Sequence, residues 1–313
     1  MAKFQRPAQS GTPSRDVLGA LYPYLLPLLV FLAITGISGQ AVVGLVAVAL
    51  VLSVGRIPWG NLRGRAGALT LAVAVYALIY LLSGLWCSFG AYAAQESTKM
   101  LAALAVFGLV LARSEKERLR RLFWSLHGVL TAVSLLCIDA GSAQVLARGF
   151  SALMKLLGCS YPLETMGYEE GVRITGIFSN ANVSAGLIAF GLLLGLYLYR
   201  TAGSEKARAA AAVTLGVEAL AFFLSFSMGA MGSFALTCVV YLVCVGRGAR
   251  LETFVLMLEC VLVTLACSFG AYAFLGTGSV VPVLLAVVCG ALIWVLDRFA
   301  GKKLVRAMEG RRR

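Results

Sequence analysis

Charged residues are scarce in this sequence, and this scarcity limits the class of protein. They make up 13% of the 313 residues, whereas hydrophobic residues make up 60%. A soluble domain of ordinary composition carries about a quarter charged residues, so a soluble globular protein is excluded. A Ser/Gly-rich linker is also lacking, and no second domain is expected.

The 8 cysteines show no metal-binding spacing. Most of them fall inside apolar runs, where a thiol serves as a small packing group, so no metal site is expected. Cys159 lies in a predicted outer segment, and a disulfide with another outer cysteine such as Cys87 stays open.

Long apolar runs are what the sequence does contain. Most are close to the twenty residues that cross about 30 Å of hydrocarbon as a helix. We predict an all-α fold, a polytopic transmembrane helical bundle with about ten spans. The expected spans are 17–37, 41–54, 66–86, 98–112, 119–138, 174–199, 207–226, 229–245, 251–274 and 280–296.

The regions before, within and after the spans divide the chain into three parts. Residues 1–16 form an N-terminal tail, 17–297 the transmembrane domain and 298–313 a basic C-terminal tail. No cleavable signal is expected, because residues 1–15 are polar and basic and the first apolar run is too long for one.

Lysine and arginine give the chain a formal net charge of +13, and their placement predicts a topology. With a cytoplasmic N-terminus, nearly all 27 basic residues fall in inner loops and tails; the exceptions are Lys99, Arg148, Lys155 and Arg173. This bias follows the positive-inside rule. It predicts a multi-pass protein of the cell membrane with both termini cytoplasmic, whose charge attracts anionic lipids at the inner face rather than nucleic acid.

The substantial outer segment is 139–173, and its first part has a helical pattern. The residues predicted near one face are Val145, Leu146, Phe150, Leu153, Met154 and Leu157, with Arg148 and Lys155 elsewhere. This pattern is typical of a helix that lies in the membrane surface. A packed cap over the transmembrane helices is the alternative.

Three ionisable residues fall near the middle of predicted spans: His127, Glu218 and Glu259. An ionisable group inside a membrane is costly to bury and is a functional hypothesis by default. A hydrogen-bonded or protonated packing group is the alternative for each. A proton-coupled transporter would need such carboxylates.

The stretch "GVRITGIFSNANVSAG" places polar groups at the mouth of an apolar run. Arg173 falls at the outer end of its span, and a guanidinium suits phosphate oxygens in a bidentate grip. Ser179 or Asn180 can cap the helix that follows, and a helix start near an arginine favours an anion. The stretch therefore predicts a site for a phosphate-bearing lipid, with a snorkelling arginine above a capped helix as the alternative.

The longer stretch "RITGIFSNANVSAGLIAFGLLLGLYLY" resembles the signature span of the O-antigen ligase and polymerase superfamily, Arg-x-x-Gly-x-Phe-x-Asn-x-Asn. The matching residues are Arg173, Gly176, Phe178, Asn180 and Asn182, and Ala181 replaces the usual proline. The segment "LLSGLWCSFGAY" is similar to the family's third-helix exit. The resemblance implies a GT-C-like membrane fold.

The resemblance also implies a function in cell-envelope polysaccharide assembly. Members of the family are metal-independent glycosyltransferases without cofactors, and they transfer glycan from an undecaprenyl-diphosphate carrier to a glycan acceptor at the outer face. Arg173 would hold the diphosphate, where a fixed cation stabilises the charge of the leaving group. The residues that would bind substrate or shape the site are Ser179, Asn180, Asn182 and Ser227.

Two departures from the family leave catalysis open. Met228 stands where members carry a second arginine, and the late outer loop that bears their histidine is reduced to "GTGSVVP". The weaker candidates for a general base are Glu164, Glu169 and Glu170. Two other functions therefore stay open: a non-catalytic scaffold or partner subunit of the same pathway, which would need a membrane partner protein, and a transporter or flippase that uses Glu218 and Glu259.

Overall fold

The computed structural model describes residues 17–34, 48, 65–83, 85–86, 106–111, 115–156, 173–178 and 180–310. Its elements are helical: α1 (Val17–Ile34), α3 (Arg65–Ser83), α5 (Lys116–Ala140), α6 (Val145–Leu156), the 3₁₀ turn η4 (Gly176–Phe178), α7 (Ala181–Thr201), α8 (Glu205–Leu224), α9 (Met228–Cys244), α10 (Arg247–Tyr272), α11 (Val281–Leu296), the π-helical turn η5 (Asp297–Gly301) and α12 (Lys302–Gly310).

The chain divides into two compact units. One comprises residues 1–30 and 38–122, and the other residues 31–37 and 123–313. In the first unit the structure describes most of α1, α3 and the first turns of α5. Helix α1 contains Pro23 and Pro27; membrane helices tolerate proline because neighbouring groups satisfy the freed carbonyls.

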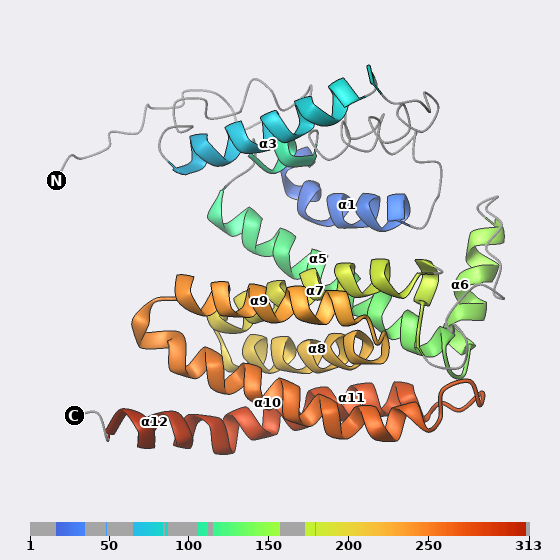
Figure 1. The fold of residues 1–313 in the computed structure, drawn as a ribbon, viewed down its shortest axis with the longest axis vertical. Helices are drawn as coiled ribbons and strands as arrows, with labels where there is room; N and C mark the ends of the chain where they lie inside the picture. Colours follow the sequence, from blue (N-terminus) through green and yellow to red (C-terminus); the bar gives the residue numbers. More distant parts are fainter. Residues whose placement is uncertain are drawn as a thin grey trace. The chain divides into compact units, whose positions relative to one another are not determined.

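The second unit is a helical bundle in which α7 to α11 lie roughly side by side, while α6 stands steeply inclined to them (Figure 1). Backbone contacts fix the direction of its helices. The Ile174 N–H donates to Leu224 O (3.0 Å), and the Gly276 N–H donates to Gly141 O (2.9 Å). The start of α7 and the ends of α5, α8 and α10 therefore share one end of the bundle, which we call the Arg173 end.

The opposite end of the bundle gathers the end of α7, the start of α8 and the end of α11. There the Tyr199 hydroxyl donates to the carboxylate of Asp297, and the guanidinium of Arg208 lies over the Tyr199 ring, 5.5 Å from its centroid. We call this the Arg208 end.

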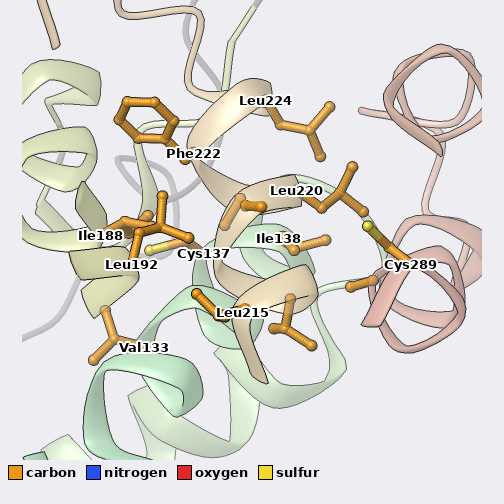
Figure 2. Packing of buried hydrophobic residues seen from close by; sticks show 14 of the residues in the cluster. Val133, Cys137, Ile138, Ile188, Leu192, Leu215, Leu220, Phe222, Leu224 and Cys289 are labelled. Atoms are coloured by element: carbon orange, nitrogen blue, oxygen red, sulfur yellow. The ribbon is translucent and has the colours of Figure 1, made fainter. Parts of the chain in front are cut away.

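Helix α8 forms the centre of the core. Leu215, Leu220 and Leu224 are fully buried, and Figure 2 shows them between α7 on one side and Cys289 of α11 on the other. Close approach to α11 depends on glycine, because a Cβ at Gly216 would overlap the backbone of Gly290. Small residues allow such backbone contact between membrane helices.

Five helices of the described residues are long and apolar enough to cross a membrane: Lys116–Ala140, Ala181–Thr201, Glu205–Leu224, Arg247–Tyr272 and Val281–Val305. Three shorter apolar helices are Ala20–Leu29, Thr70–Ser83 and Met228–Cys244. The chain is thus a helical membrane protein. The expected spans 41–54 and 98–112 lie largely outside the described residues, so about ten spans and a GT-C-like arrangement stay predictions.

Candidate functional site

The segment that carries Arg173 is held against the ends of two helices. Its next residue, Ile174, is bonded to the last residue of α8, Leu224. Gly176 has a φ of 61°, and a Cβ there would overlap the side chain of Cys137 in α5, so only glycine fits. Arg173 itself is partly buried. Because Ile174 is bonded to Leu224, the backbone of Arg173 lies beside the C-terminus of α8, where a positive charge is favoured.

Asn180 caps α7. Its Oδ1 accepts the backbone N–H of Asn182 (2.9 Å) and of Val183 (3.3 Å), and its φ of −149° is the extended conformation of an N-cap. The predicted cap is thus confirmed at Asn180. The side-chain oxygen is occupied by this role, although the residue is exposed.

Asn182 has a different partner. Its Oδ1 accepts a hydrogen bond from Ser227 Oγ at 2.8 Å, and Ser227 in turn caps α9 by accepting from the Ala230 N–H (3.4 Å). Met228, the first residue of α9, is 78% exposed. The structure therefore brings two of the predicted substrate residues, Asn182 and Ser227, into contact at the Arg173 end, and Met228 adds no cation there.

Several predicted residues lie outside the described part of the chain: Cys87, Cys159, Glu164, Glu169, Glu170 and Ser179. Their roles as base, cap or disulfide partners stay predictions. The free cysteines in the described part are Cys137, Cys238, Cys244, Cys260, Cys267 and Cys289. The buried ones among them serve as packing groups.

A carboxylate that the sequence analysis missed lies at the Arg173 end. Asp139 is 2% exposed, and its two oxygens accept the N–H groups of Val145 (3.2 Å) and Ala147 (2.8 Å). These are N-terminal donors of α6, so Asp139 caps that helix from outside it. The signal was an aspartate placed shortly before a helical run.

Helix α6 buries a different face from the predicted one. Its buried residues are Ala147, Ser151 and Met154. Val145 and Leu153, predicted on the same face as Met154, are 64% and 53% exposed, and Arg148 and Lys155 are exposed as well. The helix thus packs on the bundle through Ala147, Ser151 and Met154 and keeps an apolar face exposed. That this face lies in the membrane surface stays a prediction.

His127 and Glu218 meet inside the bundle. Both side chains are 0% exposed, and His127 Nδ1 lies 3.1 Å from Glu218 Oε1, at ion-pair distance. His127 Nε2 lies 2.7 Å from Thr214 Oγ1, and Thr131 Oγ1 lies 2.9 Å from Glu218 Oε1. We call these four side chains of α5 and α8 the His–Glu cluster.

Two glycines of α7 make room for the His–Glu cluster. A Cβ at Gly191 would lie 3.0 Å from the carboxylate atoms of Glu218, and one at Gly195 would lie 2.7 Å from His127 Cε1. The pair is therefore enclosed by the α7 backbone. No space for a ligand adjoins the carboxylate on that side.

Glu259 belongs to a separate polar group toward the Arg208 end. Its Oε2 is buried without a hydrogen-bond partner, and a Cβ at Gly301 in η5 would lie 2.6 Å from its Oε1. Asp297, which is 5% exposed, lies within electrostatic range of Glu259. The structure thus separates the two glutamates that a transporter was expected to use together.

An apolar groove of about 450 Å³, counting the space at its mouth, opens between α7, α8, α9 and α10. Its lining residues are Leu192, Leu196, Leu215, Ala219, Phe222, Phe223, Phe234, Cys238, Met257, Cys260 and Val261. Neither Glu218 nor Glu259 lines it. Among the described residues, no three His, Cys, Asp or Glu side chains gather where they could hold a metal ion.

The arrangement can therefore do two things chemically. At the Arg173 end it offers one arginine, a Ser–Asn hydrogen bond and a capped helix start to a polar ligand, and within the bundle it holds a buried acid–base pair. Comparison with family models, curated proteins and solved structures finds no match to this chain.

Proposed function

We propose that this chain is an O-antigen ligase- or polymerase-like membrane protein that binds a polyprenyl-diphosphate-linked glycan at the Arg173 end. The single observation that carries the proposal is the position of Arg173. Its neighbour Ile174 is hydrogen-bonded to the last residue of α8, and it lies at the same end of the bundle as the contact between Asn182 and Ser227. These residues belong to the stretch that resembles the family signature.

The charge distribution of the bundle supports an outer position for this site. The Arg208 end and its loops carry Arg200, Lys206, Arg208, Arg247, Arg250, Arg298 and Lys303. In the described part of the second unit, the Arg173 end has only Arg148, Lys155 and Arg173. By the positive-inside rule, this bias favours a cytoplasmic Arg208 end and an outer Arg173 end.

The proposed chemistry is electrostatic. When the bond between the sugar and the carrier diphosphate breaks, negative charge accumulates on the leaving phosphate oxygens. The guanidinium of Arg173 would stabilise that charge, and it would do so more strongly in a poorly hydrated site than in water. Asn182 and Ser227 would contact the sugar or keep the site in shape.

A second candidate is a non-catalytic subunit that presents the lipid carrier to a membrane partner protein. The exposed Met228 favours it, because a thioether at the start of α9 cannot hold phosphate. The transporter alternative lacks such support, since Glu218 is enclosed by α7 and lines no part of the apolar groove.

The first experiment replaces Arg173 in a strain whose surface glycan depends on the gene. We expect Arg173→Ala to lower glycan incorporation by roughly a hundredfold or more, the usual cost of removing one transition-state donor, at unchanged protein level. Arg173→Lys should retain part of the activity, because an ammonium keeps the charge but loses the bidentate grip. The measurement is the amount of surface glycan per unit of protein.

Arg148→Ala is the matched control, since Arg148 is an exposed arginine of α6 at the same end and should leave incorporation unchanged. Normal incorporation by the Arg173→Ala variant contradicts the proposal. Purified wild-type protein that binds the lipid-linked glycan through Arg173 but transfers none of it indicates the partner subunit.

A further inference from the structure

The His–Glu cluster contains two ionisable side chains that the proposed function does not use. His127 is the only histidine of the chain, and it is as deeply buried as Glu218. An isolated charge at such a position would cost several kcal/mol, on the order of the penalty for any buried unpaired ion. The protonation of the two side chains is therefore constrained by their surroundings.

The hydrogen atoms of the cluster can be assigned from its contacts. Thr214 has one hydroxyl hydrogen, and its Oγ1 lies 2.9 Å from Ala210 O and 3.1 Å from Ala211 O. With that hydrogen donated to a carbonyl, Thr214 Oγ1 accepts from His127 Nε2 at 2.7 Å. The ring therefore carries a hydrogen on Nε2, and Nδ1 faces Glu218.

Glu218 offers one place for a further proton. Its Oε2 has no hydrogen-bond partner, so a proton on that atom would be a buried, unsatisfied donor. Its Oε1 lies 3.1 Å from His127 Nδ1. Among the described residues, the side chains that act on the Glu218 carboxyl are the ionisable ring of His127 and the hydroxyl of Thr131.

We propose that His127 and Glu218 form an intramembrane site that binds a single proton, held between Nδ1 and Oε1. Whether the proton rests on nitrogen or on oxygen, the pair has a net charge of zero and leaves no ion uncompensated. The α7 backbone at Gly191 and Gly195 closes the site against the carboxylate and the ring, so the proton leaves only when α5, α7 and α8 separate.

The site consequently couples proton binding to helix packing. Residues from α5 and α8 supply the two halves of the pair, and the proton is what lets them meet without a net charge. This inference does not depend on the proposed glycan-binding site, because the cluster lies within the bundle and shares no residue with the Arg173 end.

A single histidine makes the test specific. Full-length protein labelled with ¹⁵N-histidine in lipid nanodiscs gives imidazole signals from His127 alone. We expect Nε2 to be protonated and slow to exchange with solvent, and Nδ1 to give the shift of a nitrogen that shares a proton. In Glu218→Gln the Nδ1 signal should move to that of an unprotonated nitrogen. The glutamine amide can donate a hydrogen bond to Nδ1 but has no acidic proton to share with it.

Glu259→Gln is the matched control, a second membrane carboxyl outside the cluster, and should leave both signals unchanged. An unprotonated Nε2, or an Nδ1 signal that does not respond to Glu218→Gln, overturns the proposal.

Thermal unfolding in detergent provides an independent readout. Glu218→Gln should change Tm little, whereas His127→Leu should lower it by several degrees, since it leaves Glu218 buried alone. The double variant with His127→Leu and Glu218→Leu should regain part of the loss, because replacing both partners by apolar groups removes the uncompensated ion. A double variant less stable than His127→Leu contradicts the pairing.

Discussion

Asn180 and Asn182 differ in role although they are two positions apart. Asn180 holds the start of α7 through two backbone N–H groups, and Asn182 holds the start of α9 through Ser227. A carbonyl oxygen engaged in a cap is less available to a sugar. At the scale of the residue, we therefore expect substitutions of Asn180 and of Asn182 to have different effects.

Replacing Asn180 tests whether it acts as a cap. Asn180→Ala should lower the free energy of unfolding by about 1 kcal/mol, the typical cost of a lost N-cap, and Asn180→Ser should restore it because serine is also a good cap. Thermal unfolding measures the first effect. Surface-glycan incorporation measures whether function follows stability.

If Asn180→Ser is as stable as the natural protein but has lost glycan incorporation, the amide contacts substrate and the cap is not its main role. Equal incorporation by both proteins assigns Asn180 to the helix start.

The contacts of His127 illustrate what sequence reasoning can reach for single residues. His127 and Thr131 are four residues apart on α5, and Thr214 and Glu218 are four apart on α8, so each pair shares a helix face. His127 and Glu218 were predicted near the middle of their spans, and the structure buries both of them inside the bundle. That the two pairs face each other depends on how α5 and α8 pack, which spacing within one helix does not specify.

At the scale of the element, α7 begins later in the sequence than predicted, and glycines line the face that it turns to α5 and α8. The apolar run predicted a span from residue 174, whereas the helix begins at Ala181. The residues before it are apolar because they are buried, Ile174 and Ile177 among them, but Gly176 turns the chain with a positive φ. Hydropathy reports burial and does not distinguish a buried turn from a helix.

The glycines of α7 allow a prediction with an internal control. A Cβ at Gly195 would lie 2.7 Å from both His127 Cε1 and Leu215 Cδ2, so Gly195→Ala should destabilise the protein by about 1–3 kcal/mol through overpacking. A Cβ at Gly186 would meet nothing within 4 Å. Gly186→Ala should be neutral or stabilising by up to ~1 kcal/mol, because alanine favours the helix.

Thermal unfolding of the two variants, at equal expression, gives the comparison. Equal Tm values for Gly195→Ala and Gly186→Ala would mean that α7 does not approach α5 and α8 as closely as the structure has it.

The choice of packing face was the hardest property of the elements to predict. Helix α9 has no buried residue, yet Leu236 and Val243, 67% and 65% exposed, are as apolar as any core residue. Faces that meet lipid and faces that meet protein have the same composition in a membrane. For the same reason, the sequence did not show that α6 buries Ala147, Ser151 and Met154 while Val145 and Leu153 stay exposed.

At the scale of the whole molecule, the helices after position 115 were predictable from the sequence, and the way they pack together was not. Within the described residues after position 115, each predicted span corresponds to a helix whose bounds differ by a few residues, α7 showing the largest difference. Length and hydropathy suffice for this, because a spanning helix must satisfy its own backbone and match the bilayer. The backbone hydrogen bonds that join Ile174 to Leu224 and Gly276 to Gly141 could be found only from the folded structure.

The orientation of the bundle is the property on which an outer glycan site depends, and thiol labelling can test it. Cys244 is exposed near the Arg208 end, and Thr277 is exposed in the connection between α10 and α11 at the Arg173 end. In a background without the other cysteines, we expect a membrane-impermeant maleimide to label Thr277→Cys in intact cells. Cys244 should react only in inside-out vesicles, because the positive-inside rule predicts that the basic end faces the cytoplasm. The reverse pattern would put Arg173 on the inner side of the membrane, whereas the proposed glycan transfer takes place at the outer face. The proposed function would then be wrong. The proposed proton site would not be affected.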